Sequence, residues 1–201
     1  LDSPNGEGSG SSYVIFGKNS GFDAILDISN LDGSNGFRLN GVAEGDQSGY
    51  SLSTAGDVNG DGFDDIIIGA NYADANGENS GASYVIFGKA SGFDATVELS
   101  SLDGNNGFRL EGAVAGDYSG RSVSTAGDFN GDGFADLIIG AFGAEPNGQD
   151  SGSSYLVYGK ASGFSASLNL ADLGSSDGIL LNGLAAGDSL GKSVSSAGDV
   201  N

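Results

Sequence analysis

The sequence predicts an all-β fold, a β-propeller of four-stranded antiparallel blades, and three observations lead to this prediction. The chain repeats with a period of 71 residues, so that Asp57 returns as Asp128 and Tyr84 as Tyr155. Each period contains short β-branched and aromatic runs bounded by Gly, a pattern typical of strands. The 38 Gly residues follow no Gly-X-Y rule and only two Pro are present, so collagen is excluded. Units of this kind bury their apolar faces only by stacking on their neighbours.

The elements of one unit follow in order along the chain. A first strand is expected at 51–56, where small residues surround Leu52, and a second at 65–69 after an acidic loop. Aromatic and β-branched residues predict a third strand at 83–88 and a fourth at 107–112. Residues 95–99 alternate in polarity and are expected to form an extra short strand or one helical turn. Four strands in each unit are typical of a propeller blade.

The repeat predicts one continuous array over residues 1–201. Strands three and four of a first blade are expected in 1–49, complete blades in 50–120 and 121–191, and the first strand and truncated acidic loop of a further blade in 192–201. About three blades are too few to close a ring, because propellers have four to eight. We therefore interpret the chain as a segment of a longer protein whose open blade edges favour association with further blades or with itself.

The acidic loop has the composition of a calcium site. Calcium takes six to eight oxygen ligands, and a loop with side-chain oxygens at positions 1, 3, 5 and 9 and a carbonyl at 7 wraps one ion. The predicted ligands are Asp57, Asn59, Asp61, the Phe63 carbonyl and Asp65, then Asp128, Asn130, Asp132, the Phe134 carbonyl and Asp136, and finally Asp199 and Asn201, which begin a third loop.

The alternative is that Asn-Gly and Asp-Gly in this loop are hairpin turn residues only. Turn formation does not explain why three carboxylates cluster in one loop. Magnesium is a less suitable ion than calcium, because it favours an octahedron that retains water. Gly-Asp segments at Asp46, Asp117 and Asp188 are better interpreted as Asx-turns than as ligands. A calcium affinity of roughly 0.1 to 1 mM, typical of extracellular modules, predicts a secreted or cell-surface protein.

With its acidic loops, the Gly69-Ala70 and Gly140-Ala141 strand ends and the segment 45–51, the chain resembles FG-GAP repeats. These repeats form the N-terminal propeller of integrin α subunits and occur in bacterial relatives. The resemblance covers nearly the whole chain and implies that ligands bind on the face opposite the calcium loops. Positions on that face differ between the repeats, and the candidate ligand-binding residues are Tyr50, Arg121, Lys192, Tyr72 and Phe142. Aromatic and Arg side chains are good contact residues, although ordinary surface variation is the alternative.

The composition of the chain disfavours several classes of function. A net charge of −20 disfavours nucleic acid and anionic membranes as partners, and no run is long enough for a membrane-spanning helix. The absence of His, Cys and Trp predicts a protein that is not an enzyme. We expect an adhesion or ligand-binding scaffold with an extracellular protein or polysaccharide ligand. The alternatives are a structural surface-layer or filament array, and a non-catalytic, lectin-like part of a carbohydrate-active enzyme.

Overall fold

A computed structural model describes residues 3–198 and is all-β apart from three single 3-10 turns. The elements are β1 (Ser11–Ile15), η1 (Ile28–Asn30), β2 (Gly36–Asn40), β3 (Ser51–Gly56), β4 (Asp65–Ala70), β5 (Ala82–Ile86), β6 (Thr96–Glu98), η2 (Leu99–Ser101), β7 (Gly107–Glu111), β8 (Ser122–Gly127), β9 (Asp136–Ala141), β10 (Ser153–Val157), β11 (Ser167–Asn169), η3 (Leu170–Asp172) and β12 (Gly178–Asn182).

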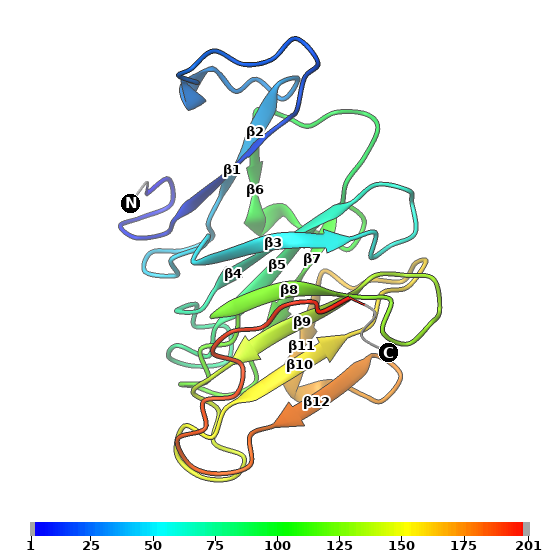
Figure 1. Ribbon diagram of the computed structural model, residues 1–201. Helices are drawn as coiled ribbons and strands as arrows, with labels where there is room; N and C mark the ends of the chain where they lie inside the picture. The colour runs from blue at the N-terminus through cyan, green and yellow to red at the C-terminus, as the bar shows by residue number, and fades with distance from the viewer. Residues whose placement is uncertain (1–2, 199–201) are drawn as a thin grey trace.

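These strands form three sheets that follow one another along the chain (Figure 1). The first sheet has the order β1-β2-β6, the second β11-β7-β5-β4-β3, and the third β12-β10-β9-β8. Strands β3, β4, β5 and β7 pair antiparallel, as do β8, β9, β10 and β12. The architecture agrees with part of a β-propeller of four-stranded antiparallel blades.

The short strands β6 and β11 extend the four-stranded pattern in a way that the sequence does not reveal. Residues 95–99 form both predicted alternatives, the strand β6 and then the turn η2. However, β6 pairs in parallel with β2 of the preceding sheet, and β11 pairs in parallel with β7. The second and the third unit therefore each contribute one strand to the sheet before it.

Apolar residues are buried mainly between successive sheets. Phe37 and Leu39 of β2 form one cluster with residues of the second sheet, among them Ile68 and Tyr84. Phe108 of β7 belongs to another cluster, which joins the second sheet to the third. Burial of apolar side chains between sheets is expected to stabilise stacked repeats, because a single sheet cannot shield its own faces from water.

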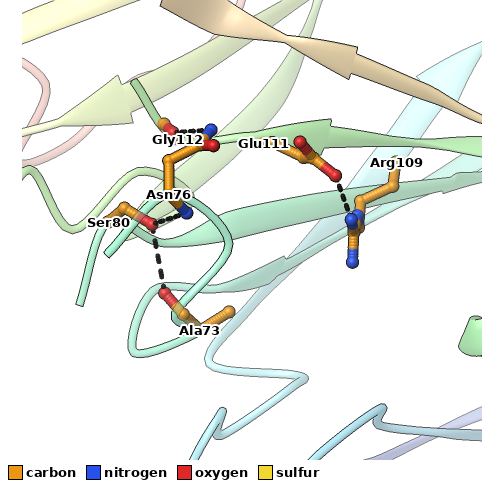
Figure 2. A network of polar contacts seen from close by, with 6 residues as sticks. All are labelled: Ala73, Asn76, Ser80, Arg109, Glu111 and Gly112. Atoms are coloured by element: carbon orange, nitrogen blue, oxygen red, sulfur yellow. Dashed lines mark hydrogen bonds and ion pairs between the residues drawn. The ribbon is translucent and has the colours of Figure 1, made fainter. Parts of the chain in front are cut away.

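Side-chain hydrogen bonds fix the connection between the second and third strands. Figure 2 shows the side chain of Asn76 donating to the carbonyl of Gly112 at 2.8 Å. The backbone N–H of Asn76 donates to Ser80 Oγ at 2.9 Å. Asn147 donates to Gly183 in the same way in the next unit, again at 2.8 Å. These bonds anchor a polar loop to the end of the fourth strand, so the loop geometry repeats with the sequence.

The expected first strand of a further blade at 193–198 is not formed. Those residues carry no strand assignment and end near the face of the third sheet. The equivalent strands β3 and β8 each pair with the strand that follows the acidic loop, and the described residues contain no such partner for 193–198. Asp199 and Asn201 lie outside the described residues. None of the described helical turns has the length and apolarity needed to cross a membrane.

Candidate functional site

The acidic loops connect the first two strands of each complete unit. Residues 57–65 join β3 to β4, and residues 128–136 join β8 to β9. All ten ligands predicted for the two complete loops therefore lie in two equivalent hairpin connections. Each loop is short enough for its polar side chains to meet one another and the loop backbone.

Within each loop the side chains accept hydrogen bonds from the loop's own backbone. Asp57 accepts from the N–H groups of Gly60 and Gly62 at 2.7 and 2.9 Å, and Asp128 accepts from Gly131 and Gly133 at 2.8 and 3.0 Å. The side chain of Asn59 donates to Asp61 at 3.0 Å. The carboxylates thus stabilise the folded loop by satisfying N–H groups that have no strand partner.

The last acid of each loop is buried and links three segments. Asp65 accepts from the N–H of Val58 and of Gly88, each at 2.8 Å, so it ties the loop to the end of β5. Burial raises the pKa of Asp65 to about 6, and these two hydrogen bonds oppose the rise. Asp136 makes the equivalent bonds to Phe129 and Gly159, and burial raises its pKa also.

The donor set agrees with calcium chemistry, but the acids are not arranged around an ion. Asp57, Asn59, Asp61 and Asp65 supply hard oxygen ligands only, which is the type that calcium prefers. Among residues 3–198, however, no three acidic side chains gather in an arrangement that could hold a metal. Their oxygens face backbone N–H groups instead. Calcium ligation by these loops is therefore a proposal that rests on their donor set.

The Gly-Asp segments have a local role, as the sequence indicates. Asp46 accepts from the N–H of Ala43 at 3.1 Å, and Asp117 accepts from the N–H of Val114 at 3.1 Å. Asp188 accepts from Ala185 at 2.8 Å. Each carboxylate closes a turn that precedes the first strand of a unit.

Four of the five candidate ligand-binding residues gather on one surface, which we call the aromatic cluster. Tyr50 packs edge-on against Tyr72 with ring centroids 6.4 Å apart. The guanidinium of Arg121 lies 4.3 Å from the ring centroid of Tyr50 and 5.9 Å from that of Phe142. The fifth candidate, Lys192, makes no cation–π contact with the cluster among the described residues.

The aromatic cluster contains one residue that sequence reasoning missed. Tyr118 lies between Tyr72 and Phe142, with centroid distances of 5.7 and 5.3 Å. Its equivalents are Gln47 and Ser189, so the disagreement between repeats that indicated Tyr50 could have indicated Tyr118 too. Its φ of 53° lies in the left-handed region, which is uncommon for a Tyr.

The aromatic cluster and the acidic loops lie at opposite ends of the same hairpins. Tyr50 precedes β3 and Tyr72 follows β4, whereas the loop 57–65 joins the other ends of these strands. Strands of this length separate the two sites by roughly 20 Å. Arg121 and Phe142 flank the next hairpin, β8 and β9, and β3 and β8 lie side by side (Figure 1). The cluster therefore spans two units.

A cavity beside this surface differs between the repeats. It has a volume of about 540 Å³ and is lined by Asp117, Glu145, Asp150 and Leu180, among others. Burial raises the pKa of Asp117 to about 6, and Glu145 adds to the rise. In the preceding unit Arg109 stands in the position of Leu180, and its charge opposes the rise that burial causes in the pKa of Asp46. The cavity at Asp117 is thus lined by acids and lacks that cation.

Comparison with known proteins agrees with these features. The FG-GAP repeat family matches residues 48–86 and 119–157. Integrin alpha-PS5 of Drosophila melanogaster is 35% identical over 104 residues, 52% of this chain and 10% of that protein. Mouse integrin alpha-2 is 35% identical over 95 residues, 47% of this chain and 8% of the relative. Integrin alpha-PS2 of Drosophila melanogaster is 32% identical over 135 residues, 65% of this chain and 9% of the relative.

The chain spans a tenth or less of the length of these curated relatives. The two matched regions include the two β-hairpins with their acidic loops and the third strand of each unit. The repeat, the sheet order and these similarities agree with one another. The comparisons support an FG-GAP, integrin-α-like protein: two stretches of the chain match the FG-GAP repeat, and the chain is similar to integrin α subunits.

Proposed function

We propose that this chain is a calcium-stabilised extracellular propeller segment that serves as an adhesion or ligand-binding scaffold. The observation that carries the proposal is the aromatic cluster at the end of the hairpins away from the acidic loops. In this cluster Arg121 lies over the rings of Tyr50 and Phe142. Tyr72 packs against Tyr50, and Tyr118 packs against Phe142. The ligand is an extracellular protein or polysaccharide.

The composition of the aromatic cluster favours recognition. Tyr50 and Tyr72 are exposed, so their rings are available to a partner without unfolding. Among the described residues no carboxylate forms an ion pair with Arg121, so its guanidinium edge has donors to offer. Aromatic and Arg residues dominate binding energy at protein interfaces, and stacking holds Arg121 in one orientation before a ligand arrives.

Calcium would stabilise the segment and not take part in recognition. Asp57, Asn59, Asp61, Asp65 and the Phe63 carbonyl would hold one ion, and the equivalent residues 128–136 a second. Binding to the folded loop alone would stabilise the fold by mass action and would relieve the repulsion among its carboxylates. An affinity in the range of extracellular modules would keep the loops filled outside the cell, which supports a secreted or cell-surface location.

We infer a non-catalytic role. The chain has no His or Cys, so the commonest general base and the thiol nucleophile are absent from it. The most clustered acids belong to the two loops, where backbone N–H groups hold them. The remaining buried acids, Asp46 and Asp117, each close a local turn.

The calcium part of the proposal is tested by thermal unfolding with millimolar calcium and with chelator. We expect calcium to raise the melting temperature, and both Asp61→Ala and Asp132→Ala to reduce that increase. Asp64→Ala is the matched control, because Asp64 is exposed and its equivalent in the second loop is Ala135. An equal calcium response in all variants would show that the loops are turns only.

The recognition part is tested separately, by binding the wild-type chain to glycan and extracellular-matrix protein arrays. A ligand that binds the wild type should be lost with Arg121→Ala and with Tyr72→Ser, and retained with Leu52→Ser, an exposed apolar control outside the cluster. Ligands that bind all three variants equally would refute the assignment of the face.

A structural array is the second candidate function. The observation that favours it is that β6 and β11 each pair in parallel with the sheet before them, so that successive units are joined by strand pairing. A lectin-like segment of a carbohydrate-active enzyme is the remaining alternative, and a positive glycan array would favour it.

A further inference from the structure

The two complete acidic loops contact each other directly. We call residues 57–65 the first acidic loop and residues 128–136 the second. The backbone N–H of Ala135 in the second loop donates to the carbonyl of Asp57 in the first at 2.9 Å. The N–H of Lys160, which lies just after β10, donates to the carbonyl of Val58, also at 2.9 Å. Two successive carbonyls of the first loop are therefore held by segments that are 70 residues or more away in the chain.

A side chain of the second loop also lies on the backbone of the first. A Cβ on Gly60 would collide with the ring of Phe134, so this ring covers Gly60 closely. The equivalent Gly131 has nearly the same backbone conformation, with a φ of 76° against 73° for Gly60. A Cβ on Gly131 would nevertheless meet open space. The ring contact at Gly60 is therefore a feature of the pair of loops and not of the turn itself.

The hydrogen bonds between the loops form a chain that begins and ends on predicted calcium ligands. The carboxylate of Asp65 accepts from the N–H of Val58 at 2.8 Å. The same peptide group carries the carbonyl of Asp57, which accepts from the N–H of Ala135. That N–H belongs to the peptide group of the Phe134 carbonyl. Because peptide groups are planar, two of them connect the orientation of the Asp65 carboxylate with that of the Phe134 carbonyl.

Small residues allow this close approach of the two loops. A Cβ on Gly56 would lie 2.6 Å from the Cβ of Ala135, so a side chain at Gly56 would displace the second loop. Ala135 stands where the first loop has the exposed Asp64. A carboxylate in place of the Ala135 methyl group would lie against the backbone at Gly56. The one eighth-position residue that faces another acidic loop is thus the small and uncharged one.

We propose that the two acidic loops bind calcium cooperatively, so that filling either loop raises the affinity of the other. The inference rests on the calcium-stabilised scaffold proposed above and adds a coupling between its two sites. Ligation of Asp65 restrains the peptide groups that lead to the Phe134 carbonyl, so the second loop loses less conformational freedom when it is filled in turn. Repulsion between two bound cations acts in the opposite sense, and salt screens it.

The experiment is a calcium titration of the 201-residue chain at about 0.15 M salt, followed by NMR of the backbone amides. Two amides report the two loops separately, because the N–H of Gly60 donates to the carboxylate of Asp57 and the N–H of Gly131 donates to that of Asp128. A cation that takes these carboxylate oxygens competes with both hydrogen bonds. The calcium midpoint of each amide shift therefore gives the affinity of its own loop.

Disabling one loop should weaken the other. In Asp61→Ala, the midpoint of the Gly131 shift should move to about fivefold higher calcium or more, and Asp132→Ala should move the Gly60 midpoint by the same factor, because coupling is reciprocal. Asp64→Ala is the matched control: it removes the same charge from the first loop at an exposed position that is not a predicted ligand, and it should leave the Gly131 midpoint unchanged.

The contact itself is tested in the second loop. Phe134→Ala removes the ring that covers Gly60 and keeps the backbone carbonyl, so it should reduce the factor by which Asp61→Ala weakens the second loop. Phe129→Ala removes a ring from the same loop at a position that is 61% exposed, and it should leave this factor unchanged. The dispersion of the strand amides in the same spectra shows whether each variant is folded.

The outcomes separate this inference from the proposed function. Amides of Gly60 and Gly131 that do not respond to calcium would refute the calcium part of the proposed function, and the coupling with it. Amides that respond with midpoints independent of the other loop would overturn the coupling alone. A shift of the Gly131 midpoint that is as large in Asp64→Ala as in Asp61→Ala would reduce the effect to charge and would also overturn it. An undiminished factor in Phe134→Ala would overturn the assignment of the coupling to this contact.

Discussion

Replacing Leu180 by Arg should change the pH dependence of stability, because it restores a cation that the neighbouring unit already has. Asp117 is only 6% exposed, and its carboxylate accepts a hydrogen bond from the N–H of Val114. Burial raises its pKa from 3.8 to about 6. In the equivalent unit, the guanidinium of Arg109 favours the charged form of Asp46. The substitution Leu180→Arg would place the same group beside Asp117.

The sign follows from proton linkage. A carboxyl whose pKa is raised on folding binds its proton more tightly in the folded state, so it costs no stability below its unfolded pKa. The free energy of unfolding falls as pH rises from about 4 to 6, and the loss is complete above the folded pKa of about 6. A difference of about two pKa units corresponds to about 3 kcal/mol. A guanidinium that is partly open to solvent should restore about 1 to 2 kcal/mol of this loss.

The assay is urea unfolding of the wild type and Leu180→Arg between pH 4 and 7, in chelator so that loop occupancy is constant. The stability of the variant relative to the wild type should rise by about 1 to 2 kcal/mol across this range. The reciprocal change Arg109→Leu should have the opposite slope, because it removes the cation from Asp46. Equal slopes for all three proteins, or NMR titration of Asp117 at an ordinary carboxyl pKa, would refute the reasoning.

Three further predictions concern the fold. Phe164→Ala should lower the free energy of unfolding by about 2 to 4 kcal/mol, because it removes the stacking on Phe108. Phe22→Ala, at the equivalent but exposed position, should lower it by less than about 0.5 kcal/mol, and equal losses in urea unfolding would contradict this geometry. Gly104 and Gly116 have similar positive φ values of 92° and 83°, but a Cβ on Gly104 would contact the Phe164 carbonyl, whereas one on Gly116 would lie in open space. Gly104→Ala should therefore lower the free energy of unfolding more than Gly116→Ala does, and urea unfolding of the two variants measures the effect of the close contact. Asp136→Asn in chelator should cost about 1 to 3 kcal/mol, because an amide cannot accept from both Phe129 and Gly159, whereas the exposed Asp64→Asn should be neutral in the same measurement.

Local features of this protein follow from the residues themselves. The period of 71 residues, the strands β3, β4, β5 and β7 and the acidic loop between β3 and β4 were all predictable, because hairpin pairing depends on neighbouring residues and on turn chemistry. Repeat comparison also identified four members of the aromatic cluster, since side chains that flank one hairpin lie near those that flank the next.

Contacts between units were decided only by the tertiary structure. The residues of β6 read as a short strand, but no local pattern indicates that it pairs with β2 of the preceding sheet. Tyr118 joins the aromatic cluster, and Arg109 acts on Asp46, for the same reason: both contacts depend on how one sheet is rotated against another. Residues 193–198 repeat the sequence of a first strand and yet form none, because a strand requires a partner for its backbone hydrogen bonds and no other described segment supplies one.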